Sequence, residues 1–503
     1  MCAGSTFEDI IENRTIPAFV DSVVVSGLNR TDERLIKKQF RSLVQSENLE
    51  DLFNNVVEAK RRLNKLGVFR HVYSVVDAAD EPNKYKIIFQ VEEKRPITAR
   101  LSATHGTDGT SKMCGAVRLN NLLRGAEYCD LDLEIGTNKL TSKCATLSKP
   151  LENNPYVRFS VGGTEGRWDH WWAKFLRQER SAFAEVQAET PIGLHKLQWD
   201  AVWREVEAKD NSTPWSVRKE SGSMLKVGIR HTFERDSRPD LVFPDSGLLC
   251  RLTKELASIN PGNLTGTSKN VTTEEGKSGP TADKSFQLKL EAVTQKPFRL
   301  TDWLVGELTF STGMVHSLTG HPVHIADRYF LGGPLELRGF QWRSVCPLEP
   351  LLQPGQMDLP LADPGTTNNV ESAQSSPSLS PIGSEGFWQT GAHLYTPLPY
   401  FGNEEDSFAS QFRLHGFCIA ASTLESPLQR LSNCIPASAS MRSLCNQLST
   451  ELGGKPRVVI GAGLVVRFAG VLRIEVNYCI PVKSQSGDLL TSGFTFGFGM
   501  YYA

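Results

Sequence analysis

The chain has 503 residues, with 55 Lys plus Arg, 56 Asp plus Glu and a net charge of −1 at pH 7. This balance argues against nucleic acid as a main partner, because binding to phosphates needs a marked excess of cations. No window reaches eighteen uninterrupted apolar residues, so the sequence predicts no membrane-spanning helix. A membrane β-barrel would leave the same hydropathy, since about half of its strand residues face a polar lumen.

The N-terminal sequence MCAGSTFEDIIENRTIP has neither the basic start nor the apolar stretch of a secretory signal. We therefore expect residues 1–16 to form a short tail in front of the first domain. The ten cysteines are scattered from Cys2 to Cys479, without Cys-x-x-Cys pairs or zinc-like spacing. They are interpreted as reduced thiols rather than as a disulfide framework.

Residues 17–95 predict a small α+β domain of strand, helix, helix, strand and strand. A β-branched run at 20–28 predicts the first strand, and Thr31 is the expected N-cap of the helix that follows it. Alternating residues at 68–77 and 84–93 predict the last two strands. Such a unit is long enough for two helices to cover one face of a three-stranded sheet.

The second helix of this domain is expected over 49–66, with Gly67 as its stop. The apolar residues that follow the helical period are Leu52, Val56, Val57 and Leu63. We expect this stripe to face the sheet.

From Ile97 onward the period changes to two, which predicts strands with one apolar face and one face of charges and glycines. Near the C-terminus the apolar face carries Leu472, Ile474, Val476, Tyr478 and Ile480, and the other face carries Arg473, Glu475, Asn477 and Cys479. The final strand sets Phe494, Phe496, Phe498, Met500 and Tyr502 against Thr495, Gly497 and Gly499.

Two folds fit this alternation: a large soluble sandwich and a closed membrane barrel. A strand of Phe, Met and Tyr at the end of the chain would leave an aromatic edge that soluble proteins avoid. About four hundred residues of alternation without crossover helices also suit a barrel of many strands better than one sandwich. The sequence therefore predicts a mainly β protein, with a transmembrane antiparallel β-barrel over 96–503.

Two stretches interrupt the alternation. Residues 259–284 are rich in Gly, Thr, Ser and Lys, and residues 345–385 are rich in Pro and Ser. Neither composition buries enough apolar surface to order itself, so both are expected to be flexible insertions.

The segment DRYFLGGPLELRGF at 327–340 resembles the sixth-loop motif of the BamA-type outer-membrane insertase superfamily, an Arg-Gly-Phe/Tyr that follows a Gly-Gly stretch. Residues 17–95 resemble a single POTRA domain of that family. Further similar stretches are NNLLRGAEYCDLDLEIG, RDSRPDLVFPDSG and GAHLYTPLP, and TFGFGMYY resembles a mitochondrial β-signal. One POTRA domain with such an ending resembles the mitochondrial sorting and assembly branch.

The resemblance implies sixteen strands and an insertase for β-barrel precursors in the mitochondrial outer membrane. The implied partners are precursor β-barrel proteins, the lipid bilayer and metaxin-like accessory subunits on the cytosolic face. The POTRA domain would lie in the intermembrane space. No nucleic acid and no cofactor are expected.

The resemblance also implies that the loop folds into the lumen, where Arg338 meets an acid on the barrel wall. The alternation places Glu475 on the lumen face, so this residue is the predicted partner; a surface arginine and an unrelated ion pair at Arg473 form the alternative. The expected loop-motif residues are Gly332, Gly333, Leu337, Arg338, Gly339 and Phe340. The expected β-signal residues are Thr495, Gly497, Met500 and Tyr502.

Other chemistries have weaker support. HPVHIAD at 321–327 contains two His and one Asp within seven residues, which makes a metal site conceivable. GAGLVV at 461–466 lacks the third glycine and the helix of a dinucleotide fingerprint. No Gly-x-Ser-x-Gly elbow or Walker A loop occurs, so an enzyme is not expected.

Three functional hypotheses therefore stand at this point. The first is an insertase with a lateral gate between the first barrel strand near 97–104 and the last strand at 493–502, where glycines weaken the pairing. The second is a passive channel or a plastid-type translocon on the same scaffold. The third is a soluble β-rich binding protein.

Overall fold

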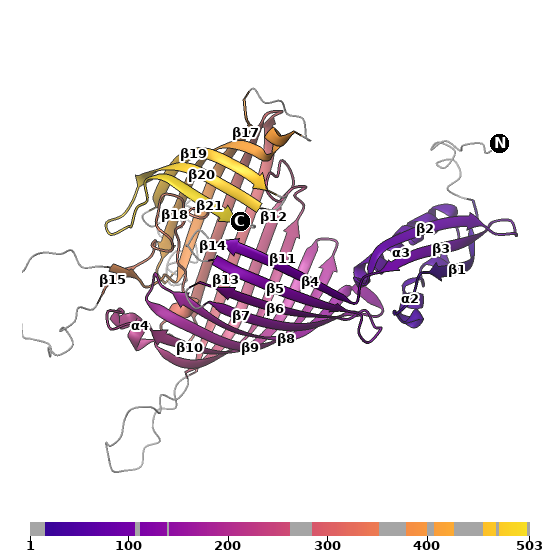
Figure 1. The fold of residues 1–503 in the computed structure, drawn as a ribbon, viewed down its shortest axis with the longest axis horizontal. Helices are drawn as coiled ribbons and strands as arrows, with labels where there is room; N and C mark the ends of the chain where they lie inside the picture. The colour runs from indigo at the N-terminus through magenta and orange to yellow at the C-terminus, as the bar shows by residue number, and fades with distance from the viewer. Residues whose placement is uncertain are drawn as a thin grey trace, which may run out of the picture.

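The computed structural model describes residues 16–105, 111–137, 140–261, 284–351, 379–399, 407–426, 456–468 and 472–499. An α+β domain lies at one end of the molecule, beside a large curved sheet (Figure 1). The elements of the domain are β1 (Phe19–Ser26), α2 (Glu33–Gln39), η1 (Leu43–Gln45), α3 (Leu49–Leu66), β2 (Phe69–Ala78) and β3 (Lys84–Glu93). This order of elements confirms the predicted strand, helix, helix, strand and strand.

The sheet of this domain has the order β1-β3-β2, with β1 parallel and β2 antiparallel to β3. The apolar stripe of α3 packs against Ile87 and Phe89 of β3 in one buried cluster. Gly67 ends α3 in the left-handed conformation (φ 82°), which glycine adopts without steric cost.

Two details of the domain differ from the prediction. The N-cap of α2 is Asp32 rather than Thr31, because the Asp32 carboxylate accepts the backbone N–H of Arg34. The Thr31 side chain instead binds Glu93. Val57 was expected in the apolar stripe of α3, but it lies on the outer side of the helix and is exposed.

The large sheet has sixteen antiparallel strands and curls into a barrel (Figure 1). Its strands are β4 (Ile97–His105), β5 (Ser111–Asn120), β6 (Tyr128–Gly136), β7 (Thr141–Leu151), β8 (Asn154–His170), β9 (Phe175–Thr190), β10 (Gly193–Ala208), β11 (Gly222–Asp236), β12 (Leu249–Pro261), β13 (Ser285–Thr301), β14 (Leu304–Ser317), β17 (Gly386–Pro397), β18 (Phe412–Leu424), β19 (Arg457–Phe468), β20 (Leu472–Lys483) and β21 (Gly493–Gly499). Each strand pairs with its neighbour in chain order, and β14 pairs with β17. Between the described residues of β4 and β21 no ladder is formed, so these are the two edge strands.

On β20 the two faces of the wall have opposite polarity. On β20, Arg473, Glu475 and Asn477 are buried inside the barrel, whereas Tyr478 and Ile480 face outward and are about half exposed. A soluble sandwich would bury its apolar face, so this arrangement contradicts the sandwich alternative and fits a wall that contacts lipid. Within the described part of the chain, no helix is long and apolar enough to cross a membrane.

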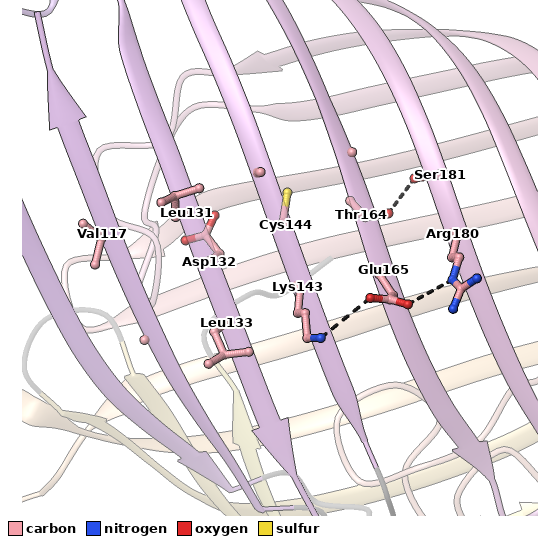
Figure 2. Close-up of a pocket in the computed structure, with 13 residues that line it drawn as sticks. Val117, Leu131, Asp132, Leu133, Lys143, Cys144, Thr164, Glu165, Arg180 and Ser181 are labelled. Carbon is pink, nitrogen blue, oxygen red and sulfur yellow. Dashed lines mark hydrogen bonds and ion pairs between the residues drawn. The ribbon is translucent and has the colours of Figure 1, made fainter. Parts of the chain in front are cut away.

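Figure 2 shows how neighbouring strands pair around a shallow hollow over β5–β9. Glu165 on β8 accepts a hydrogen bond from Arg180 on β9 (2.9 Å) and pairs with Lys143 on β7 (3.7 Å). The adjacent residues Thr164 and Ser181 are on the other face, where their hydroxyls lie 2.5 Å apart. Each face of the wall therefore has its own cross-strand contacts.

The cores of the two predicted insertions, 262–283 and 352–378, lie outside the described residues. The ends of the second predicted insertion, 345–385, are ordered, although the whole insertion was expected to be flexible. Short strands β15 (Leu348–Pro350) and β16 (Leu379–Pro381) pair there as an antiparallel sheet. Backbone hydrogen bonding to each other, rather than apolar burial, explains why these Pro-rich ends are ordered.

Candidate functional site

The connection between β14 and β17 folds back into the barrel. Its residues Leu331, Leu337 and Phe340 are buried in a cluster with inward-facing side chains of β18, β19 and β20. The wall members of this cluster are Phe417, Ile419, Ala421, Val459 and Cys479. The loop motif therefore has an apolar seat on the inner wall of the C-terminal strands.

The glycines of the motif allow this close approach. Gly332, Gly333 and Gly339 have φ angles of 112°, 131° and 78°, which disfavour any residue with a Cβ. A Cβ on Gly332 would lie 2.4 Å from the Gln341 carbonyl oxygen. A Cβ on Gly339 would lie 3.1 Å from Val459 Cγ2, so the motif backbone lies directly against the wall.

The structure brings Arg338 and Glu475 together. Arg338 Nε donates to Glu475 Oε2 at 3.0 Å, and Arg338 Nη2 lies 2.8 Å from the same oxygen and 3.0 Å from Oε1. Both side chains are almost fully buried. The guanidinium also lies over the Phe417 ring, with 5.0 Å from its central carbon to the ring centroid. Such planar pairing with a carboxylate is the geometry that distinguishes arginine from lysine.

Glu475 has a second cationic neighbour. Arg473 Nε lies 2.6 Å from Glu475 Oε1, and Arg473 Nη2 donates to the Tyr395 hydroxyl at 2.9 Å. The burial of Arg338 contradicts the alternative of a surface arginine. The ion pair at Arg473, which was part of that alternative, does form, because one carboxylate serves both arginines. Arg338 comes from the loop and Arg473 from the wall, so only the first of these contacts depends on the position of the loop.

A chain of polar side chains leads to the same carboxylate from the wall. His393 Nδ1 lies 3.0 Å from His415 Nε2, and His415 Nδ1 lies 3.4 Å from Asn477 Oδ1. Asn477 Nδ2 donates to Glu475 Oε2 at 2.6 Å. Buried polar groups need such partners, and this chain fixes the orientation of the acid.

The sequence analysis did not identify the two histidines of this hydrogen-bonded series, His393 and His415. Asn477 was placed on the correct face by alternation, but no role was assigned to it. His393 lies in GAHLYTPLP, and the alternation of β17 and β18 was the signal that could have placed His393 and His415 inside. Their contact joins strands β17 and β18 to β20, which a one-dimensional pattern does not specify.

The last described strand, β21, lies beside the loop. The Thr495 hydroxyl is 3.2 Å from Cys479 Sγ and donates to the Asn477 carbonyl at 3.4 Å. Gly497 lies under the loop, since a Cβ there would be 2.6 Å from Leu335 Cδ2. The remaining predicted β-signal residues, Met500 and Tyr502, lie outside the described residues.

Glu93 holds the segment of the α+β domain that contacts the barrel. Its carboxylate accepts hydrogen bonds from the Thr31 hydroxyl (2.6 Å) and from the backbone N–H groups of Arg30 and Thr31. Thr31 in turn accepts from Asn121 Nδ2 in the β5–β6 turn at 2.9 Å. Partial burial opposes ionisation of Glu93, but these donors outweigh it and hold the pKa of this carboxyl below its ordinary value.

Comparisons with known proteins agree with this architecture. A family model described as the Omp85 superfamily domain matches residues 173–501. The Xenopus laevis sorting and assembly machinery component 50 homolog B is 30% identical over 507 residues, which cover 98% of this chain and 92% of that protein. The Homo sapiens homolog is 28% identical over 499 residues, with the same coverage.

Among solved structures, BamA from Haemophilus ducreyi lacking POTRA domains 1–3 is similar in fold. It has a TM-score of 0.67 and 14% sequence identity, and the match covers 96% of this chain and 85% of that one. At this identity the likeness concerns the fold alone.

Proposed function

Because the chain belongs to the Omp85 superfamily, we propose that it is an insertase that folds β-barrel precursor proteins into the mitochondrial outer membrane. The names of its relatives, homologs of a sorting and assembly machinery component, support this proposal. The observation that carries it is the seat of the loop, where buried Arg338 binds Glu475 on the strand next to an edge strand. In this proposal the ion pair holds the loop against β20, the neighbour of the edge strand β21, and does so without a bound substrate or cofactor.

The proposed mechanism is a lateral gate between β4 and β21. On β4, the residues from Ile97 to Ser102 are all exposed, so neither face of this strand is covered by packing. On β21, Gly493 and Gly497 contribute no side chain to cross-strand contacts. Unpaired backbone groups in lipid cost several kcal/mol each, so an open seam favours pairing with an incoming strand. The terminal strand of a precursor would take that place on the β4 edge.

The domain organisation follows from this proposal. Residues 17–95 would be a POTRA domain in the intermembrane space, 96–503 the barrel, and metaxin-like subunits would bind on the cytosolic side. The α+β domain contacts the turns β5–β6 and β7–β8, whereas the β14–β17 loop starts from the opposite end of the barrel. A membrane-impermeant maleimide should therefore label a cysteine placed at exposed Tyr73 only after the outer membrane of mitochondria is ruptured.

A disulfide lock tests the gate. Single cysteines are placed on β4 at 97–102 and on β21 at 493–497, in a background without native reactive thiols, and pairs closer than about 7 Å between Cα atoms are oxidised. The matched control is Val117→Cys with Leu131→Cys, a facing pair on β5 and β6 away from the seam. We expect the seam lock to stop assembly of a radiolabelled precursor reversibly, and the control lock to leave it unchanged. Normal assembly by seam-locked protein would refute the gate.

A second experiment separates the insertase from a passive channel. Purified protein in planar bilayers would conduct ions under either hypothesis, but only an insertase accelerates assembly of an added precursor in liposomes. Conductance without any acceleration would favour the channel.

A further inference from the structure

The N-terminal end of the loop motif has a second buried charge cluster, separate from the one at Arg338. Asp327, the last residue of the short helix η2 (Ile325–Asp327), is 5% exposed. Its Oδ1 accepts a hydrogen bond from Lys226 Nζ at 2.8 Å, and its Oδ2 accepts from Arg204 Nη1 at 3.1 Å. Both cations are themselves buried on the inner wall, on β11 and β10.

The ion pairs on the wall side of this cluster contain more cations than carboxylates. Arg204 Nε donates to Glu179 at 2.6 Å, and Glu255 pairs with Lys226 at 2.6 Å and with Arg230 at 2.8 Å. These wall residues are three cations and two carboxylates, and a fourth cation, Arg177, lies 3.6 Å from Glu179. The ion pairs of the wall therefore leave an excess of positive charge, which Asp327 of the loop reduces. An uncompensated buried charge is strongly unfavourable, so the wall selects an acid at this position of the loop.

A metal does not explain Asp327. Both of its oxygens are occupied by cations of the wall, and His324 Nε2 lies 2.8 Å from the Glu220 carbonyl oxygen. Among the described residues, no group of three His, Cys, Asp or Glu side chains is arranged to hold a metal ion. Protein contacts therefore account for two of the three candidate ligands in HPVHIAD, His324 and Asp327.

The two charge clusters hold opposite ends of the motif to different sectors of the barrel. Asp327 binds β10 and β11, whereas Arg338 binds β20. In the sheet order, the strands β13, β14, β17, β18 and β19 lie between β12 and β20. Tyr329, two residues after Asp327, also binds the wall, since its hydroxyl donates to Glu291 on β13 at 3.1 Å.

We propose that Asp327 is a positioning residue that anchors the loop to β10–β12, so that the motif is a strut between two distant sectors of the wall. Arg338 then reaches Glu475 in a fixed register because both ends of the strut are held. Release of either end would leave the loop free to leave the C-terminal strands. The structural part of this inference is independent of the proposed insertase function, on which only its consequence for precursor assembly rests.

The test compares Asp327→Asn with Asp327→Glu, which restores the charge. The double variant Asp327→Asn with Lys226→Met removes one charge of each sign. Arg204 keeps its contact with Glu179 and Arg230 keeps its contact with Glu255, so the anchor is removed without leaving either arginine unpaired. Asp302→Asn, at an exposed aspartate in the β13–β14 turn, is the matched control. Heat modifiability on gels confirms that each barrel is folded.

The first readout is the distance between spin labels at Glu336 in the loop and at exposed Trp303 in the β13–β14 turn. We expect one distance in the unsubstituted protein, a second and broader population in Asp327→Asn and in the double variant, and a return to one distance in Asp327→Glu. An unchanged single distance in the folded double variant would overturn the anchor. A broadened distance in the control would also count against it.

The second readout is assembly of a precursor in liposomes. We expect the double variant to lose most of the assembly rate and Asp327→Glu to recover it. A displaced loop with a normal assembly rate would overturn the link between the strut and assembly. If the unsubstituted protein shows no assembly, the insertase proposal fails, and the distance measurement still decides whether Asp327 is an anchor.

Discussion

Because the Glu475 carboxylate contacts two arginines, we expect Arg338→Ala and Glu475→Ala to differ in their effects. Arg338→Ala removes the loop arginine but leaves Glu475 paired with Arg473 at 2.6 Å. Glu475→Ala removes the carboxylate that both buried guanidinium groups contact, together with the acceptor of the Asn477 Nδ2 hydrogen bond. The two substitutions therefore should not be equivalent, although they break the same bond.

The expected losses of unfolding free energy follow from the burial of these groups. Removing one partner of a buried pair costs about 3–5 kcal/mol of unfolding free energy. Glu475→Ala should reach the upper part of that range because two cations lose their acid. Arg338→Ala should cost about half as much, roughly 2 kcal/mol, because Arg473 still compensates the carboxylate. The double variant should cost less than the sum of the single variants, as for any pair in direct contact.

Denaturant unfolding in detergent measures these free energies, and precursor assembly in liposomes measures the functional effect. Arg299→Ala is the control, since it breaks a pair with Asp245 in which the arginine is exposed and the carboxylate only partly buried. That control should cost less than about 1 kcal/mol and leave assembly unchanged. Equal effects of Arg338→Ala and Glu475→Ala, with an additive double variant, would refute the shared carboxylate.

Two further predictions concern the last strand and the domain junction. Gly497→Ala should displace the loop and slow assembly, because the new Cβ would lie 2.6 Å from Leu335 Cδ2. Gly416→Ala on β18 should be neutral, because a Cβ there would have no atom within 4 Å. Spin-label distances to the loop distinguish the two variants. Since the folded-state pKa of Glu93 is depressed, its contribution to the junction should be complete above the ordinary Glu pKa of about 4.3 and be lost as the pH falls through its lower folded-state value. Hydrogen exchange of the Arg30 and Thr31 amides measures this loss. Glu93→Gln should reproduce the loss at neutral pH. Glu92→Gln is the control and should not, because the Glu92 carboxylate pairs with Arg70 on the surface at 3.5 Å.

The sequence determined the elements because their signals are local. Period-two alternation placed Glu475 and Asn477 inside and Tyr478 outside, and Gly67 marked the end of α3 through its left-handed backbone. The same local reasoning failed at the cap of α2, where Thr31 and Asp32 are both suitable residues. Glu93, which is sixty-two residues away in the chain, decides between them by taking the Thr31 hydroxyl.

Which inward-facing residues meet depends on the tertiary structure. Alternation assigns a side chain to a face, but the position around the barrel comes from the register of sixteen strands and from the path of the loop. Glu475 lies 137 residues from Arg338, and Asp327 lies 123 residues from Arg204. These pairs form because burial leaves a charged group no favourable alternative to an opposite charge, and the fold determines which one is within reach.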